Sequence, residues 1–110
     1  MAIQDWRFEK NLPRYIQVIH LIENGEIKYN SHDSDTVELP PQYADLARRT
    51  WRETNSEGAF IVGFITELGF PVKHSGFMYV SNGEIEGDAE TLRRWRYYSR
   101  INTNWFHISD

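Results

Sequence analysis

The sequence contains no cysteine, which excludes a disulfide framework, a cysteine-based zinc site and a thiol nucleophile. No apolar run approaches the roughly 18 residues that a membrane-spanning helix needs. The first seven residues carry charge and lack the apolar region of a secretory signal. Internal repeats and interdomain linkers are also missing. These absences predict a cytoplasmic protein in which residues 1–110 form a single domain.

The chain also has no excess of positive charge, since its formal net charge is −4. A protein of this charge is not expected to coat nucleic acid or an anionic membrane in a general way. The cations are nevertheless concentrated, because seven of the twelve lie in two short stretches. These are Arg48, Arg49 and Arg52, and then Arg93, Arg94, Arg96 and Arg100. An anionic partner would have to bind at one of them.

Aromatic residues, in contrast, are abundant at 15% of the chain. Each buried aromatic side chain removes roughly 150–250 Å² from water, so a few of them can form much of a small core. Tyrosine, tryptophan and arginine are also the residue types enriched at binding hot spots. The surplus therefore favours a protein-binding or regulatory domain.

Residues 15–30 alternate in a way that predicts a β-hairpin around Asn24-Gly25, the dipeptide that suits a tight type I′ turn. Its predicted core face carries Ile16, Val18, His20, Ile22, Ile27 and Tyr29. Polar residues also recur at 14, 17, 20 and 23, so a helix over residues 12–23 capped by Asn11 is the alternative interpretation.

A helix is predicted from Pro40-Pro41 to about Thr54, after a short extended piece at residues 36–39, because proline is tolerated in a first helical turn. An apolar stripe at helical spacing supports it, formed by Tyr43, Leu46, Ala47, Thr50 and Trp51.

The second half of the chain reads mostly as strands. As a strand, residues 59–66 are apolar on both faces, and their β-branched and aromatic content favours a buried strand over a helix capped by Ser56. Residues 76–81 alternate as a strand before a second Asn-Gly turn, and residues 104–108 form a closing strand. Between them, Asp88 is expected to cap a helix to about Ser99. The order predicts an α+β fold, an antiparallel sheet with two helices, in a ferredoxin-like β-α-β-β-α-β arrangement with an extra N-terminal hairpin.

The predicted helix over residues 88–99 carries the first candidate site. Arg93, Arg96, Tyr97 and Arg100 recur at helical spacing opposite Leu92 and Trp95. Arginine binds carboxylates and phosphates with two parallel hydrogen bonds, and tyrosine can stack on a base or a guanidinium. These four residues form the predicted contact stripe for a protein partner. A solvated face paired with nearby carboxylates is the alternative.

The strand Gly76-Phe77-Met78-Tyr79-Val80 is the second candidate. It resembles the RNP1 element of RNA-recognition motifs, in which aromatic residues at alternate positions stack on bases. The resemblance implies that Phe77 and Tyr79 stack on single-stranded RNA or DNA. The sequence departs from the motif at Ser75, Met78 and Asn82, and no RNP2 partner strand is recognisable.

Catalytic and metal-binding motifs are not evident. His32-Asp33-Ser34-Asp35 combines metal-binding residue types, but its spacing matches neither an EF-hand loop nor the H-x-x-x-H and H-E-x-x-H patterns, so a polar surface loop is predicted. No nucleophile, acid–base pair or phosphate-binding loop stands out, so no cofactor is expected. The chain is predicted to be a non-enzymatic protein-binding or regulatory domain, with a protein partner or a second copy as its ligand. A single-stranded nucleic-acid binder and a small histidine-dependent enzyme are the alternatives.

Overall fold

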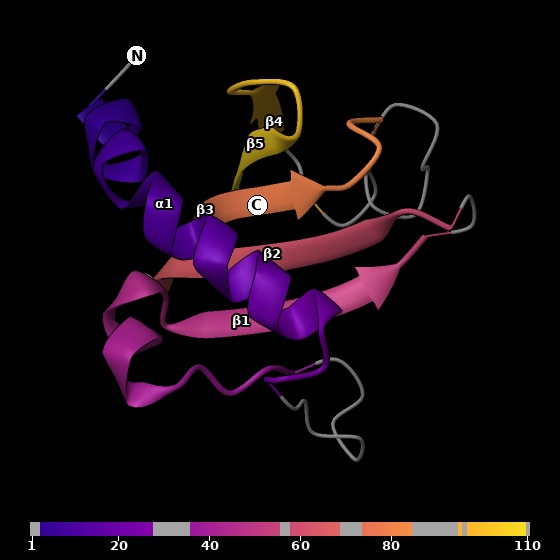
Figure 1. The fold of residues 1–110 in the computed structure, drawn as a ribbon. Coiled ribbons are helices and arrows are strands. Elements are labelled where there is room, and N and C mark those ends of the chain that lie inside the picture. The colour runs from indigo at the N-terminus through magenta and orange to yellow at the C-terminus, as the bar shows by residue number, and fades with distance from the viewer. Residues whose placement is uncertain are drawn as a thin grey trace.

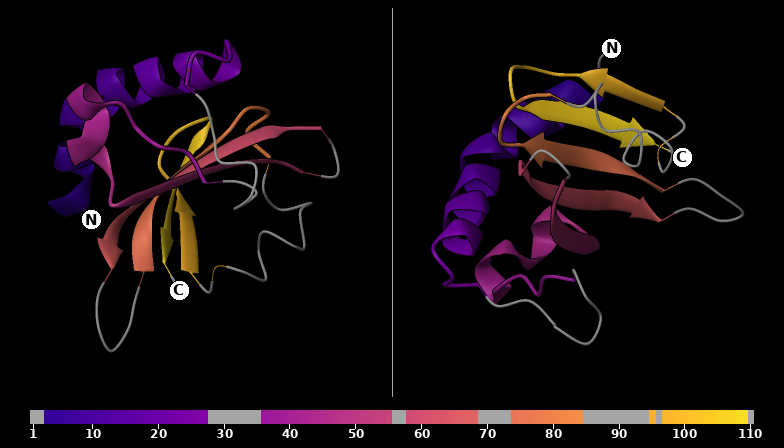
Figure 2. Two further views of the ribbon diagram at one scale, coloured as in Figure 1. Left: turned by 90° about the horizontal axis from the view of Figure 1, so that it is seen from below. Right: turned by 90° about the vertical axis from the view of Figure 1, so that its right-hand side faces the viewer.

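The chain forms an antiparallel sheet with helices on one of its faces (Figures 1 and 2). The computed structural model describes residues 3–27, 36–55, 58–68, 74–84, 95 and 97–109. The elements are α1 (Ile3–Glu23), the 3-10 helix η2 (Pro41–Leu46), β1 (Arg49–Thr54), β2 (Phe60–Leu68), β3 (His74–Val80), β4 (Tyr97–Arg100) and β5 (Trp105–Ser109). Their order across the sheet is β1-β2-β3-β5-β4. The predicted α+β class with an antiparallel sheet is confirmed, and the described residues contain two helices, α1 and η2.

Helix α1 occupies the segment for which a hairpin was predicted. Its buried side chains follow helical spacing and include Phe8, Tyr15, Ile19 and Ile22. Ile16 and His20, which the hairpin would have placed in the core, are exposed. The hairpin prediction was therefore wrong, and its helical alternative was closer. Burial of this stripe outweighs the strand preference of the β-branched residues.

The Asn24-Gly25 pair ends α1 instead of forming a hairpin turn. Gly25 has a φ of 74°, and its N–H donates to the carbonyl oxygen of Ile22 at 3.1 Å. The N–H of Glu26 donates to the carbonyl oxygen of Leu21 at 2.8 Å. Together these two bonds form a Schellman motif, in which glycine adopts the left-handed conformation after the last helical turn.

Residues 40–54 contain one short helix and one strand, so the single long helix predicted there was wrong. Helix η2 stops at Leu46, and Ala47, which follows it, is extended. β1 then pairs with β2 over its whole length, from Arg49 opposite Ile65 to Thr54 opposite Phe60. Pairing with a strand further along the chain overrides the local helical pattern.

Three strand predictions are confirmed, because residues 59–66, 76–81 and 104–108 fall largely on β2, β3 and β5. Thr36 forms an isolated bridge with Trp51, in agreement with the extended piece predicted at residues 36–39. The second Asn-Gly pair does lie in a turn, closed by Gly83 N–H donating to Val80 at 3.0 Å. β3, however, pairs with β2 and β5, so this turn does not make a hairpin.

The C-terminal end of the helix predicted over residues 88–99 was wrong. Residues 97–100 form β4, which pairs antiparallel with β5. The preceding part of that prediction, residues 88–94 and 96, lies outside the described residues. The ferredoxin-like order is not observed either, because β1 pairs directly with β2, the next strand along the chain, and α1 precedes both.

Each face of the sheet carries its own core. We call the side covered by α1 and η2 the helical face, and its core contains Val62, Phe64, Phe77 and Trp105 beneath α1. The opposite face buries a second cluster around Ile61, Ile65, Met78, Trp95, Phe106 and Ile108. Trp51 packs on this second cluster, where its ring stacks on Trp95 at 5.8 Å between centroids. The central strands are therefore buried on both sides, as their continuous apolar sequences indicate.

Candidate functional site

The predicted arginine stripe is not a single face of a helix. Arg93 and Arg96 lie outside the described residues, and Tyr97 and Arg100 belong to the strand β4. Positions three apart in a strand point to opposite sides of a sheet. Tyr97 is opposite Ser109 on the helical face, whereas Arg100 is opposite Phe106 on the other face. The structure thus separates the two described members of the stripe.

Arg100 holds the end of β4 in place. Its guanidinium donates hydrogen bonds to the carbonyl oxygens of Thr103, at 2.8 Å, and Gly83, at 2.9 Å. The same group lies over the ring of Phe106, 4.7 Å from its centroid. These contacts join the β4–β5 connection to the turn after β3. Arg100 therefore has a structural role that was not predicted from the sequence.

The two tyrosines of β4 are the most exposed aromatic side chains among those the structure describes. Tyr97 is 57% exposed and Tyr98 is 39% exposed, and the adjoining Ser99 and Arg100 are exposed as well. β4 lies at the edge of the sheet and pairs with β5 on its inner side. Within the described part of the chain, no strand pairs with its outer side.

Phe77 and Tyr79, the predicted base-stacking residues, both point to the helical face. Phe77 is 5% exposed, and its ring lies 4.8 Å from that of Phe8 on α1. Tyr79 is half-buried, with its ring 5.3 Å from that of Trp105. Burial also raises the pKa of Tyr79. The helix therefore covers the Phe77 ring that the RNP1 resemblance would assign to a base.

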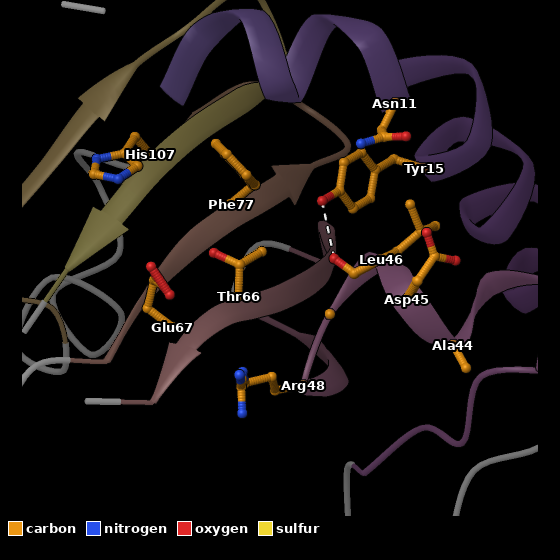
Figure 3. Close-up of a pocket in the computed structure, with 11 residues that line it drawn as sticks. Asn11, Tyr15, Ala44, Asp45, Leu46, Arg48, Thr66, Glu67, Phe77 and His107 are labelled. Carbon is orange, nitrogen blue, oxygen red and sulfur yellow. Dashed lines mark hydrogen bonds between the residues drawn. The ribbon is translucent and has the colours of Figure 1, made fainter. Parts of the chain in front are cut away.

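A cavity of about 340 Å³ lies where α1 and η2 meet one end of the sheet. Figure 3 shows its lining side chains, which come from α1, from η2 and the residues that follow it, and from the strands. The lining residues are Asn11, Tyr15, Ala44, Asp45, Leu46, Ala47, Arg48, Thr66, Glu67, Phe77 and His107. This combination of charged rim and aromatic floor was not predicted from the sequence, because its members are scattered over almost the whole chain.

An ion pair joins the two helical elements beside this cavity. The guanidinium of Arg14 on α1 donates to both carboxylate oxygens of Asp45 on η2, at 2.6 and 2.9 Å. The hydrogen bonds from Arg14 hold the pKa of Asp45 below its ordinary value. Arg14 also donates to the carbonyl oxygen of Gln42 at 2.7 Å. The pair therefore joins η2 to α1, and Arg14 compensates the charge of the Asp45 carboxylate.

Three of the four histidines lie in the described part of the chain. His20 is exposed on α1 rather than buried, which corrects its predicted core position. His74 is exposed at the start of β3. His107 lines the cavity, with its ring edge-on to Phe77 at 5.9 Å between centroids. The His32-Asp33-Ser34-Asp35 candidate lies outside the described residues. Among the described residues, no three metal-binding side chains gather to form a cation site.

The comparisons with known proteins give no further guide to the site, since no protein-family model, curated protein or solved structure matches the chain. None of the helices in the described part of the chain has the length and apolar content of a membrane span. Two surfaces therefore remain for functional interpretation, the exposed edge of β4 and the cavity beside η2.

Proposed function

We propose that the protein is a small protein-binding domain that associates through the outer edge of β4, and that its partner is a second copy of the same chain. The observation that carries this proposal is the exposure of Tyr97 and Tyr98, two consecutive residues of an edge strand. A buried core removes most large aromatic side chains from water, so two adjacent exposed ones mark a contact surface.

An edge strand offers a row of backbone N–H and carbonyl groups to which another strand can add. Natural edges are commonly protected by lysine, proline or a covering element. β4, with the sequence Tyr-Tyr-Ser-Arg, has neither lysine nor proline. Because Tyr97 and Tyr98 point to opposite faces, one ring can pack on each side of an added strand.

The side chains of β4 suit pairing with themselves. In an antiparallel pair that keeps the faces of the two sheets aligned, a two-fold axis at Tyr98 places it opposite the Tyr98 of the second copy. A two-fold axis at Ser99 instead places Tyr98 opposite Arg100. Aromatic pairs and tyrosine–arginine pairs both stabilise cross-strand contacts, by roughly 0.2–1 kcal/mol each. The register about Ser99 does not bring two arginines together, because it places Arg100 opposite Tyr98.

The test is the oligomeric state of the purified protein, measured by sedimentation equilibrium over a range of concentrations. We expect a monomer–dimer equilibrium that Tyr98→Lys weakens at least tenfold, since a charge on an edge strand opposes pairing. Ile16→Lys is the matched control, because Ile16 on α1 is 38% exposed and Tyr98 is 39% exposed. The control should leave the equilibrium unchanged.

Two results would contradict the proposal. One is a wild-type protein that remains monomeric up to about 1 mM, which corresponds to less than roughly 4 kcal/mol of association free energy. The other is a dimer that Ile16→Lys disrupts and Tyr98→Lys leaves intact, because that places the contact on α1. Thermal unfolding of each variant shows whether the monomer is still folded.

A further inference from the structure

We propose that the cavity between α1, η2 and the sheet binds a small zwitterion, an α-amino acid with an apolar side chain. Arg48 would bind its carboxylate and Glu67 its ammonium group. This site is separate from the β4 edge and does not depend on it. Both residues line the cavity, and Figure 3 shows Arg48 after η2, Glu67 near the end of β2, Tyr15 on α1 and Phe77 on β3.

A β-bulge in β2 turns Glu67 towards the cavity. Ile65 is opposite Gly76 and Glu67 is opposite Ser75, so Thr66 is an extra residue between them. In a regular strand Glu67 would be opposite His74 and would point to the other face. The bulge moves Glu67 to the helical face, where both it and Thr66 line the cavity. Bulges commonly re-aim side chains next to functional sites.

Arg48 and Glu67 do not compensate each other's charge. Within the described part of the chain, neither forms an ion pair, so their charged atoms lie more than 4.0 Å apart. The backbone N–H of Arg48 donates to Ile65 at 2.8 Å, which fixes this residue beside the bulge. Two opposite charges held apart at one cavity suit a ligand that carries both charges itself.

The remaining carboxylate of the lining does not compete for the ammonium group. Asp45 accepts both hydrogen bonds of the Arg14 fork, and its charge is thereby compensated. Glu67 is therefore the carboxylate left to bind a cation. The same reasoning assigns the ligand's carboxylate to Arg48, because Arg14 is already committed to Asp45.

The floor of the cavity is apolar. Tyr15 and Phe77 are almost fully buried, and the Tyr15 hydroxyl donates to the carbonyl oxygen of Leu46 at 3.0 Å. That hydrogen bond satisfies the hydroxyl, so the ring offers its apolar surface. The volume of about 340 Å³ lies at the small end of the 300–1,000 Å³ usual for ligand sites. It suits a single amino acid better than a nucleotide.

The experiment is a titration of the isotopically labelled protein with L-leucine, followed by two-dimensional amide NMR spectra. N-acetyl-leucine, which lacks the ammonium group, and leucinamide, which lacks the carboxylate, are titrated in parallel. We expect saturable shifts for the amides of Tyr15, Phe77 and His107, with a dissociation constant of about 1 mM or tighter. Each blocked analogue should bind at least tenfold more weakly.

Substitutions assign the two charges. Glu67→Gln should reduce leucine affinity at least tenfold and leave N-acetyl-leucine binding unchanged. Arg48→Gln should reduce leucine affinity to that of leucinamide. Arg49→Gln and Glu84→Gln are the matched controls, because both residues are exposed and neither lines the cavity. They should bind leucine as the wild type does.

Three results would overturn the proposal. The first is the absence of saturable shifts with leucine up to about 50 mM, well above the expected dissociation constant. The second is equal binding of leucine and both blocked analogues. The third is full leucine affinity in both Arg48→Gln and Glu67→Gln. Amide spectra of the unliganded variants establish that each is folded, so a loss of binding is not mistaken for unfolding.

Discussion

At the scale of single residues, Gly63 shows how closely the second core is packed. Gly63 lies in the middle of β2, opposite Trp51 on β1. A Cβ atom on Gly63 would come within 1.9–2.2 Å of three atoms of the Trp51 ring. That ring also stacks on Trp95, and its N–H donates to Glu53 at 2.8 Å. The tryptophan therefore lies flat across the strand because the strand has no side chain there.

We expect Gly63→Ala to destabilise the protein by about 1–3 kcal/mol, the usual cost of forcing extra volume into a packed site. The loss should shrink in a Trp51→Leu background, since the smaller side chain leaves room for the new methyl group. Urea unfolding of the four proteins in this double-mutant cycle measures the coupling. Equal losses in both backgrounds would show that the ring of Trp51 is not the obstacle.

At the scale of elements, one dipeptide explains the largest error of the sequence interpretation. Asn24-Gly25 supplies a positive φ angle, which both a hairpin turn and a helix C-terminus can use. Pro13 lies in the interior of α1, so it counts against a helix that begins well before it. The apolar stripe that decides between them begins at Phe8, before the proline. Local rules cannot compare the apolar stripe with the turn signal, because the stripe stabilises the helix only when it is buried against the sheet.

We expect Gly25→Ala to cost roughly 1–2 kcal/mol, because an L-residue is strained in the left-handed conformation. A new Cβ at Gly25 meets no atom within 4 Å, so this cost comes from the backbone alone. Gly25→Asn should cost less, since asparagine tolerates this conformation. Thermal or urea unfolding ranks the three proteins. Equal stability of all three would contradict the assigned role of the Schellman motif.

The strands that could be predicted are those whose own apolar sequence indicates burial. β2 and β3 are apolar because both faces of the central sheet are covered. β1 and β4 lie at the edges, and their sequences contain charged and polar residues that also fit a helix. Pairing with β2 and β5 decides their structure, and that information lies elsewhere in the chain. The same holds for the cavity. A bulge between Ile65 and Glu67 places a carboxylate there, and no sequence motif predicts this position.

At the scale of the whole molecule, the two ends of the chain meet in one core. Phe8 on the first helix is 1% exposed, and its ring lies 5.2 Å from that of Trp105 on the last strand. It also contacts Tyr15 and Phe77. This aromatic cluster joins α1 to β3 and β5, so α1 and β5 should lose their structure together.

We therefore expect Phe8→Ala to destabilise the whole domain by about 3–5 kcal/mol, a large share of the 5–15 kcal/mol that stabilises a typical domain. Phe8→Leu is a milder change, so this variant should remain folded and lose less stability. Ile16→Ala, on the exposed side of the same helix, should change stability by less than about 0.5 kcal/mol. Hydrogen exchange is the decisive measurement, because in Phe8→Leu the amides of α1 and β5 should lose protection to the same extent. If only α1 exchanged faster while β5 kept its protection, the helix would be an accessory to an independently stable sheet.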